Sequence, residues 1–188
     1  MAAYRLKENS PELKIVITEK GDELEKRHCP VGRDKTCVHC KICSITNGYA
    51  GAGAFSDGKF NLGTAYGGTL GEELGDTLAN QYIDEVDKIL DKYCTSGKVK
   101  VYKSNGELKL KCIQNNLRLL DMNVKHLGTD KNFITMQNLI AALREMGVTM
   151  LSHYDCASVE KNDNGYTLNY ANGDKIDAEK IIIATGRS

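Results

Sequence analysis

The chain has 188 residues, and its 25 Lys and Arg residues balance its 25 Asp and Glu residues, so the formal net charge is zero. This length suits one sizeable core with at most a small appendage, and the balanced charge gives no electrostatic reason to expect a nucleic-acid or membrane-surface partner. Apolar runs such as Ile181–Ala184 are too short to cross a membrane, and the charged N-terminus lacks the apolar stretch of a signal peptide.

The seven cysteines indicate the redox compartment of the protein. In a chain without a secretion signal, cysteines are more often reduced thiols, metal ligands or redox centres than structural disulfides. We therefore expect a cytoplasmic protein.

The N-terminal residues predict the last turns of a helix, followed by a short buried strand. Tyr4 and Leu6 precede the helix-breaking cluster Asn9–Pro11. The β-branched run "IVIT" then ends at Glu19 and Lys20, a pattern typical of a buried strand.

Residues 21–71 predict a long functional loop. This stretch is rich in glycine, holds four of the seven cysteines and has few periodic apolar positions. Loops of this length inside a compact domain usually need a ligand or a metal to order them.

Two amphipathic helices are predicted in the middle of the chain. From Glu72 to Tyr93 apolar side chains recur every three or four residues, with Glu72 and Glu73 in the first turn. A second helix is predicted over residues 131–146, with Gly147 as its stop. Between the two helices, residues 98–102 predict a strand, and residues 107–127 predict a short helix followed by extended chain. The apolar face of the second helix comprises Phe133, Met136, Ile140 and Leu143.

The C-terminal part predicts strands throughout. "VTMLSHY" is strand-like, and the runs "CASVEK", "GYTLNY" and "DKIDA" are separated by the turn sequences "NDNG" and "ANGD". Because Asn and Gly tolerate positive φ, these turns predict a three-stranded meander over residues 155–178. The final run "KIIIATGRS" is a continuous apolar stretch, typical of a strand buried on both faces of a parallel sheet.

The end of the first strand is a candidate cofactor contact. In dinucleotide-binding folds an acidic residue at a strand end accepts hydrogen bonds from the ribose hydroxyls, and Glu19 occupies such a position. The alternative is an ordinary solvated residue at a strand-to-loop junction. The small residues "ATG" after the last strand would bring backbone to the carboxyl edge of the same sheet, where cofactors bind.

Five segments together carry a resemblance to a known family. The segments "EKRHCP", "CVHCKICS", "GAGAFSDGK", "HLGTD" and "IIIATGRS" span Glu25 to Ser188, and "GAGAFSDGK" and "HLGTD" are the specific ones. Together they resemble the uncharacterised bacterial FAD-dependent dehydrogenases, also called NAD(FAD)-utilizing dehydrogenases, which have the glutathione-reductase type of FAD-binding fold.

The resemblance implies an α/β fold class. It implies an incomplete Rossmann-like FAD-binding domain, with a parallel sheet and a three-stranded β-meander, and part of a second substrate or cap region. Residues 1–71 and 128–188 would form the FAD-binding part, with a cysteine-containing loop over 27–47, and residues 72–127 would be an inserted helical cap. The family begins with a strand and a G-x-G-x-x-G turn that this sequence lacks and continues beyond "ATGRS", so we expect a fragment of a longer protein.

The same resemblance implies a set of cofactor-binding residues. The glycine-rich segment would lie along the flavin, with glycines that let the backbone approach the ring and with polar side chains around it. The alternative is a glycine-rich hinge without a ligand. His126 would face the substrate, although a helix-capping loop with a solvated histidine is an equally good interpretation. The implied cofactor contacts are Glu19, Lys20, Gly51, Gly53, Ser56, Asp57, Gly58, Lys59, Thr185 and Gly186.

The cysteines allow three interpretations. Cys37, Cys40 and Cys43 form a C-x-x-C-x-x-C motif with Cys29 upstream, and four sulfurs suit tetrahedral zinc or an iron–sulfur cluster. A second interpretation is a dithiol that exchanges electrons with the flavin, and a third is four free thiols. The remaining cysteines, Cys94, Cys112 and Cys156, are predicted to be small buried hydrophobic residues.

These features predict a fragment of an FAD-dependent oxidoreductase. It would transfer electrons or hydride through the flavin, with NAD(P)H as a candidate donor and a small-molecule substrate or an electron carrier as partner. The alternatives are a metal-binding cysteine-knuckle interaction module and a flavoprotein-like domain without cofactor. The substrate and the oligomeric state are left open.

Overall fold

The structure is a computed structural model that describes residues 1–31, 35–95, 97, 99–103, 105–120 and 122–186. The fold is α/β, with one small parallel sheet and two antiparallel sheets. Among the described residues, no helix is long and apolar enough to cross a membrane.

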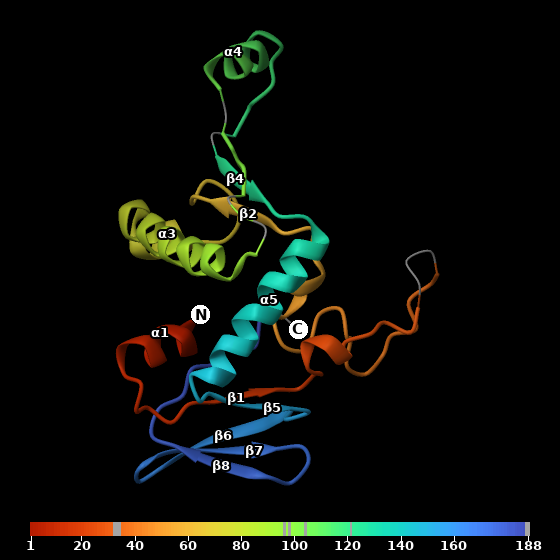
Figure 1. Cartoon of the computed structure of the whole chain (residues 1–188), viewed down its shortest axis with the longest axis vertical. Coiled ribbons are helices and arrows are strands. Elements are labelled where there is room, and N and C mark those ends of the chain that lie inside the picture. The colour runs from red at the N-terminus through yellow and green to blue at the C-terminus, as the bar shows by residue number, and fades with distance from the viewer. Residues whose placement is uncertain (32–34, 96, 98, 104, 121, 187–188) are drawn as a thin grey trace.

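The parallel sheet consists of β1 (Val16–Glu19) and β5 (Thr149–Ser152), whose register places Val16 opposite Thr149 and Glu19 opposite Ser152. Both strands were predicted, β1 from its β-branched run and β5 from the strand-like run "VTMLSHY". Helices α1 (Ala2–Asn9) and α5 (Thr129–Glu145) lie on one side of this pair, and the C-terminal meander lies on the other side (Figure 1).

The meander confirms the predicted hairpins. It contains β6 (Cys156–Asn162), β7 (Gly165–Tyr170) and β8 (Lys175–Ala178), paired antiparallel in the order β6-β7-β8. The Tyr170 hydroxyl contacts the Thr18 hydroxyl at 3.3 Å, which connects the meander to β1.

A third sheet was only partly predicted. It contains β2 (Lys59–Leu62), β3 (Val101–Tyr102) and β4 (Asn123–His126) in the order β2-β4-β3. Strand β2 lies within the stretch predicted as loop, because four residues give too short a pattern to read alone. The predicted strand over 98–102 is confirmed at its end, and its first residue lies outside the described residues.

The predicted helix over residues 72–93 is divided in two. Gly75, with φ of 78°, separates α2 (Leu70–Leu74) from α3 (Asp76–Tyr93). The apolar face of α3 is buried at Ala79 in its first turn and at Ile89 and Leu90 near its end, whereas Tyr82 is 48 % exposed. Helix α4 (Gly106–Gln114) follows at the end of the molecule opposite to the meander (Figure 1).

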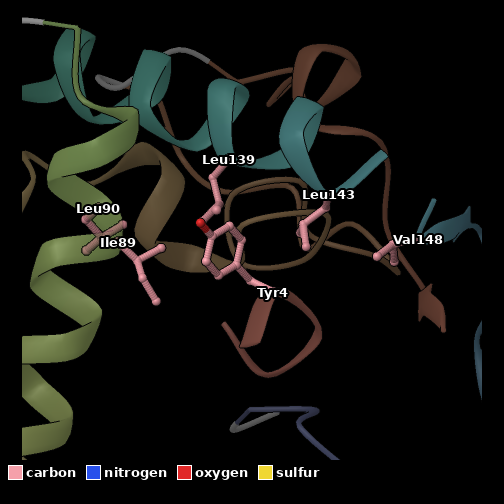
Figure 2. Packing of buried hydrophobic residues seen from close by; sticks show 6 residues of the cluster. All are labelled: Tyr4, Ile89, Leu90, Leu139, Leu143 and Val148. Atoms are coloured by element: carbon pink, nitrogen blue, oxygen red, sulfur yellow. The ribbon is translucent and has the colours of Figure 1, made fainter. Parts of the chain in front are cut away.

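Helix α5 organises the hydrophobic core. Its Leu139 and Leu143 meet Tyr4 of α1, Ile89 and Leu90 of α3 and the following Val148 in one buried cluster (Figure 2). A second cluster joins Ile140 of α5 to the short 3-10 helices η1 (Leu24–Lys26) and η2 (Ala52–Phe55). Its buried members are Leu24, Tyr49, Ala54 and Ile140.

Two predictions about buried residues are wrong. Residues 181–186 form no strand, and Ile182 and Ile183 are 66 % and 70 % exposed. An apolar run predicts burial, but a strand also needs a neighbouring strand with a free edge to pair with. No described strand pairs with residues 181–186. Cys156 is also exposed, at the start of β6, which is an edge strand of the meander.

The division into an FAD-binding part and a cap at residue 72 stays a prediction. Strand β2 precedes that boundary and β4 lies within the proposed cap, yet the two strands pair directly, with Lys59 opposite His126. The buried Lys125 of β4 binds Asp87 and Asp91 of α3 at 2.7–2.9 Å, so α3 is fixed to the same sheet.

Candidate functional site

The segments "GAGAFSDGK" and "HLGTD" meet at the N-terminus of α5. The Leu127 N–H donates to the Gly58 carbonyl at 2.9 Å, and the Gly128 N–H donates to the Asp57 carbonyl at 2.9 Å. We call residues 51–59 together with residues 126–132 the glycine-loop site. Segments that lie about 70 residues apart in the sequence therefore form one structural unit.

The side chain of Asn132, in the first turn of α5, connects the two segments. Its side chain is fully buried, and its amide nitrogen donates to the carbonyls of Gly53 at 2.8 Å and Ala54 at 3.3 Å. Its Oδ1 atom is buried without a hydrogen-bond partner among the described residues. A buried acceptor without a partner costs free energy, so this oxygen is a position that a donor group on a ligand could satisfy.

Gly58 must be glycine for this packing. Its φ is +66°, and a Cβ atom there would lie 2.9 Å from the Asn132 Cβ and 3.0 Å from the Leu127 Cβ. Both the backbone conformation and the close contact exclude a larger residue. By contrast, Cβ atoms at Gly51 and Gly53 would meet nothing within 4 Å, so the backbone there faces open space.

A charged cluster lies at the edge of the site. Asp57 Oδ2 binds Lys59 Nζ at 2.7 Å and lies 3.9 Å from His126 Nε2. The hydrogen bond from Lys59, together with the charges of Lys59 and His126, lowers the pKa of Asp57. All three side chains are exposed, so they are accessible to a ligand.

The Ser56 hydroxyl stabilises the loop itself. It donates to the Gly53 carbonyl at 2.8 Å and accepts from the Gly58 N–H at 3.2 Å. Thus Ser56 shapes the turn between η2 and β2, and only its exposed face is available to a ligand.

Arg27 was not singled out from the sequence and is central in the structure. Its guanidinium is buried and donates to four carbonyls: Ser44 at 2.9 Å, Ile45 at 2.8 Å, Tyr49 at 2.6 Å and Gly51 at 2.9 Å. It also lies 4.7 Å from the centre of the Phe55 ring. Burial lowers the pKa of Arg27, and the charge of Glu19 opposes this shift. The "EKRHCP" segment contains this residue, but no local pattern indicates carbonyl partners so far along the chain.

Glu19 serves the same loop. At the end of β1, its Oε1 atom accepts from the N–H groups of Gly21 at 2.9 Å and Gly48 at 3.0 Å. The predicted ribose contact therefore has only Oε2 available. Lys20, the neighbouring predicted contact, is half-buried just beyond the strand.

Tyr49 is a second residue that sequence reasoning missed. It is 5 % exposed, and its hydroxyl is buried without a hydrogen-bond partner among the described residues. Burial raises the pKa of Tyr49 to about 12. The sequence gives no signal for this environment, which arises from the packing of the loop against η1, η2 and α5.

The four cysteines of the loop do not form the predicted metal site. Among the described residues, no three His, Cys, Asp or Glu side chains converge as metal ligands. All four thiols are free, with Cys37 and Cys40 exposed and Cys29 and Cys43 partly buried. The residues present therefore do not fit zinc or an iron–sulfur cluster.

The predicted contacts at the C-terminus are Thr185 and Gly186. Thr185 and Gly186 are exposed, and among the described residues no hydrogen bond connects them to the glycine-loop site. Their role in cofactor binding stays a prediction.

Comparisons with known proteins give similarities to solved structures alone. No protein-family model and no curated protein matches the chain. Among solved structures, the chain is similar to the L-amino acid deaminase from Proteus myxofaciens in complex with anthranilate, with a TM-score of 0.33 and 12% identity. The similarity covers 91% of this chain and 39% of that chain, so this chain spans about two fifths of the deaminase. A TM-score this low does not establish a shared fold.

Proposed function

We propose that the chain is part of an FAD-dependent oxidoreductase and that the glycine-loop site lies along the flavin. The observation that carries this proposal is the meeting of "GAGAFSDGK" and "HLGTD" in one unit. These are the two segments most specific to the bacterial FAD-dependent dehydrogenases that the sequence resembles, and the Leu127–Gly58 and Gly128–Asp57 hydrogen bonds join them.

The residues of the site suit a flavin. Backbone open to space at Gly51 and Gly53 allows a flat ring to approach closely, which side chains at these positions would prevent. The partnerless Oδ1 of Asn132 is a buried acceptor, and the flavin ring carries an N–H donor. Glu19 would use its Oε2 atom for a ribose hydroxyl, because Oε1 already holds the loop.

When bound, FAD supplies the electron-transfer chemistry, and the protein supplies binding, orientation and electrostatics. Lys59 would place a positive charge beside the cofactor and so favour a reduced, anionic ring. His126 Nε2 lies 3.9 Å from the Asp57 carboxylate, so its imidazole would face a small-molecule substrate or NAD(P)H that approaches this exposed edge. Because the cysteines do not fit a metal, no step is assigned to one.

The test is an FAD titration of the purified chain, followed by quenching of flavin fluorescence. Gly53→Val fills the open space at the site, and Gly106→Val is a matched control. Gly106 also faces open space without a positive φ, but it lies on α4, far from the site (Figure 1). Both substitutions should leave the far-UV circular dichroism unchanged.

We expect the wild type and Gly106→Val to quench flavin with equal affinity. Gly53→Val should bind about tenfold more weakly or worse, which corresponds to a loss of at least about 1.4 kcal/mol. The proposal is refuted if the wild type leaves flavin fluorescence unchanged, or if Gly53→Val binds as tightly as Gly106→Val.

A further inference from the structure

The segment from Cys40 to Asn47 lies outside the glycine-loop site and contains two free thiols at C-x-x-C spacing. Cys40 is exposed and Cys43 is partly buried. The backbone bends at Lys41 and Ile42, between the two cysteines, so the chain changes direction there. Such a bend shortens the separation of the two residues, which a disulfide requires to be below about 7 Å between Cα atoms.

Cys43 begins a tight turn. The Thr46 and Asn47 N–H groups donate to the Cys43 carbonyl at 3.1 Å and 2.9 Å, which closes the turn.

Arg27 adds a positive charge behind this turn. Its guanidinium donates to the carbonyls of Ser44 at 2.9 Å and Ile45 at 2.8 Å, the two residues that follow Cys43. These partners are neutral carbonyls, so no hydrogen-bonded carboxylate cancels the charge. The Thr46 hydroxyl first, then the backbone N–H groups of Ile45 and Thr46 and the charge of Arg27, lower the pKa of the Cys43 thiol, which favours the thiolate.

We propose that Cys40 and Cys43 form a reversible redox dithiol that reacts with small disulfides, with Cys43 as the attacking thiolate and Cys40 as the resolving thiol. In the first step the Cys43 thiolate attacks one sulfur of the small disulfide, forms a mixed disulfide and releases one thiolate. In the second step Cys40 loses its proton and attacks the Cys43 sulfur, which releases the second thiolate. The protein is oxidised by two electrons, and the small disulfide is reduced to two thiols.

This inference is independent of the flavin, and a peptide map tests it directly. The full chain is incubated with oxidised glutathione near neutral pH, free thiols are blocked, and the protein is digested with trypsin. Trypsin cleaves after Lys41, so Cys40 falls in the peptide 36–41 and Cys43 in the peptide 42–59. A Cys40–Cys43 disulfide leaves these two peptides joined, whereas a Cys37–Cys40 disulfide stays inside the first peptide.

Four variants identify the roles of the thiols. We expect the joined peptides in the wild type and in Cys37→Ser, glutathione held on Cys43 in Cys40→Ser, and no joined product in Cys43→Ser. Thr46→Val should slow the reaction about twofold to threefold, because a lost hydrogen bond raises the thiol pKa while the higher nucleophilicity offsets part of the loss. Circular dichroism checks that each variant is folded.

Three results would overturn the proposal. The first is a joined product that disappears in Cys37→Ser, since Cys37 would then be the partner of Cys43. The second is a wild-type rate that is unchanged when the chain is unfolded in guanidinium, because the turn would then contribute nothing. The third is one equivalent of zinc in freshly purified protein that protects these thiols from glutathione.

Discussion

Replacing Arg27 by methionine should release the loop that carries both the cysteines and the glycines. The guanidinium makes four hydrogen bonds to carbonyls and one contact with an aromatic ring. Hydrogen bonds to charged groups contribute about 1.5–3 kcal/mol each, so the four together contribute roughly 6–12 kcal/mol before other costs. Removing the buried cation also removes its desolvation penalty, which is several kcal/mol. We therefore expect Arg27→Met to lower the free energy of unfolding by about 3 kcal/mol.

Urea denaturation measures this change, and Lys26→Met is the matched control. Lys26 precedes Arg27, but its side chain is 68 % exposed and pairs only with Glu23 on the surface at 3.3 Å. The control should change stability by less than about 0.5 kcal/mol. Tryptic cleavage after Lys41 in the native protein should also be faster in Arg27→Met. Equal stability and equal cleavage rates in the two variants would refute the role assigned to Arg27.

Three further predictions concern stability. Lys125→Met should lower the free energy of unfolding by about 2–3 kcal/mol, because Asp87 and the half-exposed Asp91 lose their buried cation. Urea denaturation measures this change, and an unchanged midpoint of the urea transition would contradict it. Tyr49→Phe should leave stability unchanged or raise it by about 1 kcal/mol, since the hydroxyl lacks a partner. The pKa of Tyr49 in the folded protein, about 12, exceeds its ordinary value of 10. The neutral hydroxyl therefore contributes its full share to the free energy of unfolding below pH 10, and this share is lost as the pH rises toward 12. The loss of stability between pH 10 and 12 should be smaller in Tyr49→Phe. Gly165→Ala should destabilise the protein by about 2 kcal/mol, since φ of Gly165 is +147° and a Cβ atom there would collide with a β8 carbonyl. A smaller decrease in melting temperature for Gly165→Ala than for Gly106→Ala would argue against this prediction.

Local patterns predicted the elements whose sequence periods are long and clear. Helix α5 was recognised from its apolar face and from Gly147, and β1 and the meander from β-branched runs and Asn-Gly turns. In each of these cases the determining interactions are short in sequence, so a pattern of a few residues contains most of the information.

Long-range pairing could not be predicted in the same way. Strand β2 pairs with β4 some 60 residues later, and its own four residues alternate polar and apolar over too short a stretch to predict a strand. At residues 181–186 the local pattern predicted a buried strand, and this prediction was wrong because the apolar run has no described partner strand. Propensity indicates what a segment can do, whereas tertiary contacts decide whether it does so.

The site residues show the same difference between local patterns and long-range contacts. The sequence indicated Gly58, Asp57, Lys59 and His126, and the structure brings these residues together. It gave no indication of Asn132, because its importance comes from carbonyls almost 80 positions earlier in the chain. The four cysteines show the converse, since a spacing that suits a metal does not by itself make the sulfurs converge.

Amide hydrogen exchange with and without FAD tests the central claim most directly. If the flavin lies along the glycine-loop site, FAD should slow exchange within residues 51–59 and 126–132, where the backbone of the two segments is joined. Exchange in α4 should be unchanged, because this helix lies far from the site (Figure 1). Equal exchange in both segments with and without saturating FAD, or protection confined to other elements, would contradict the account.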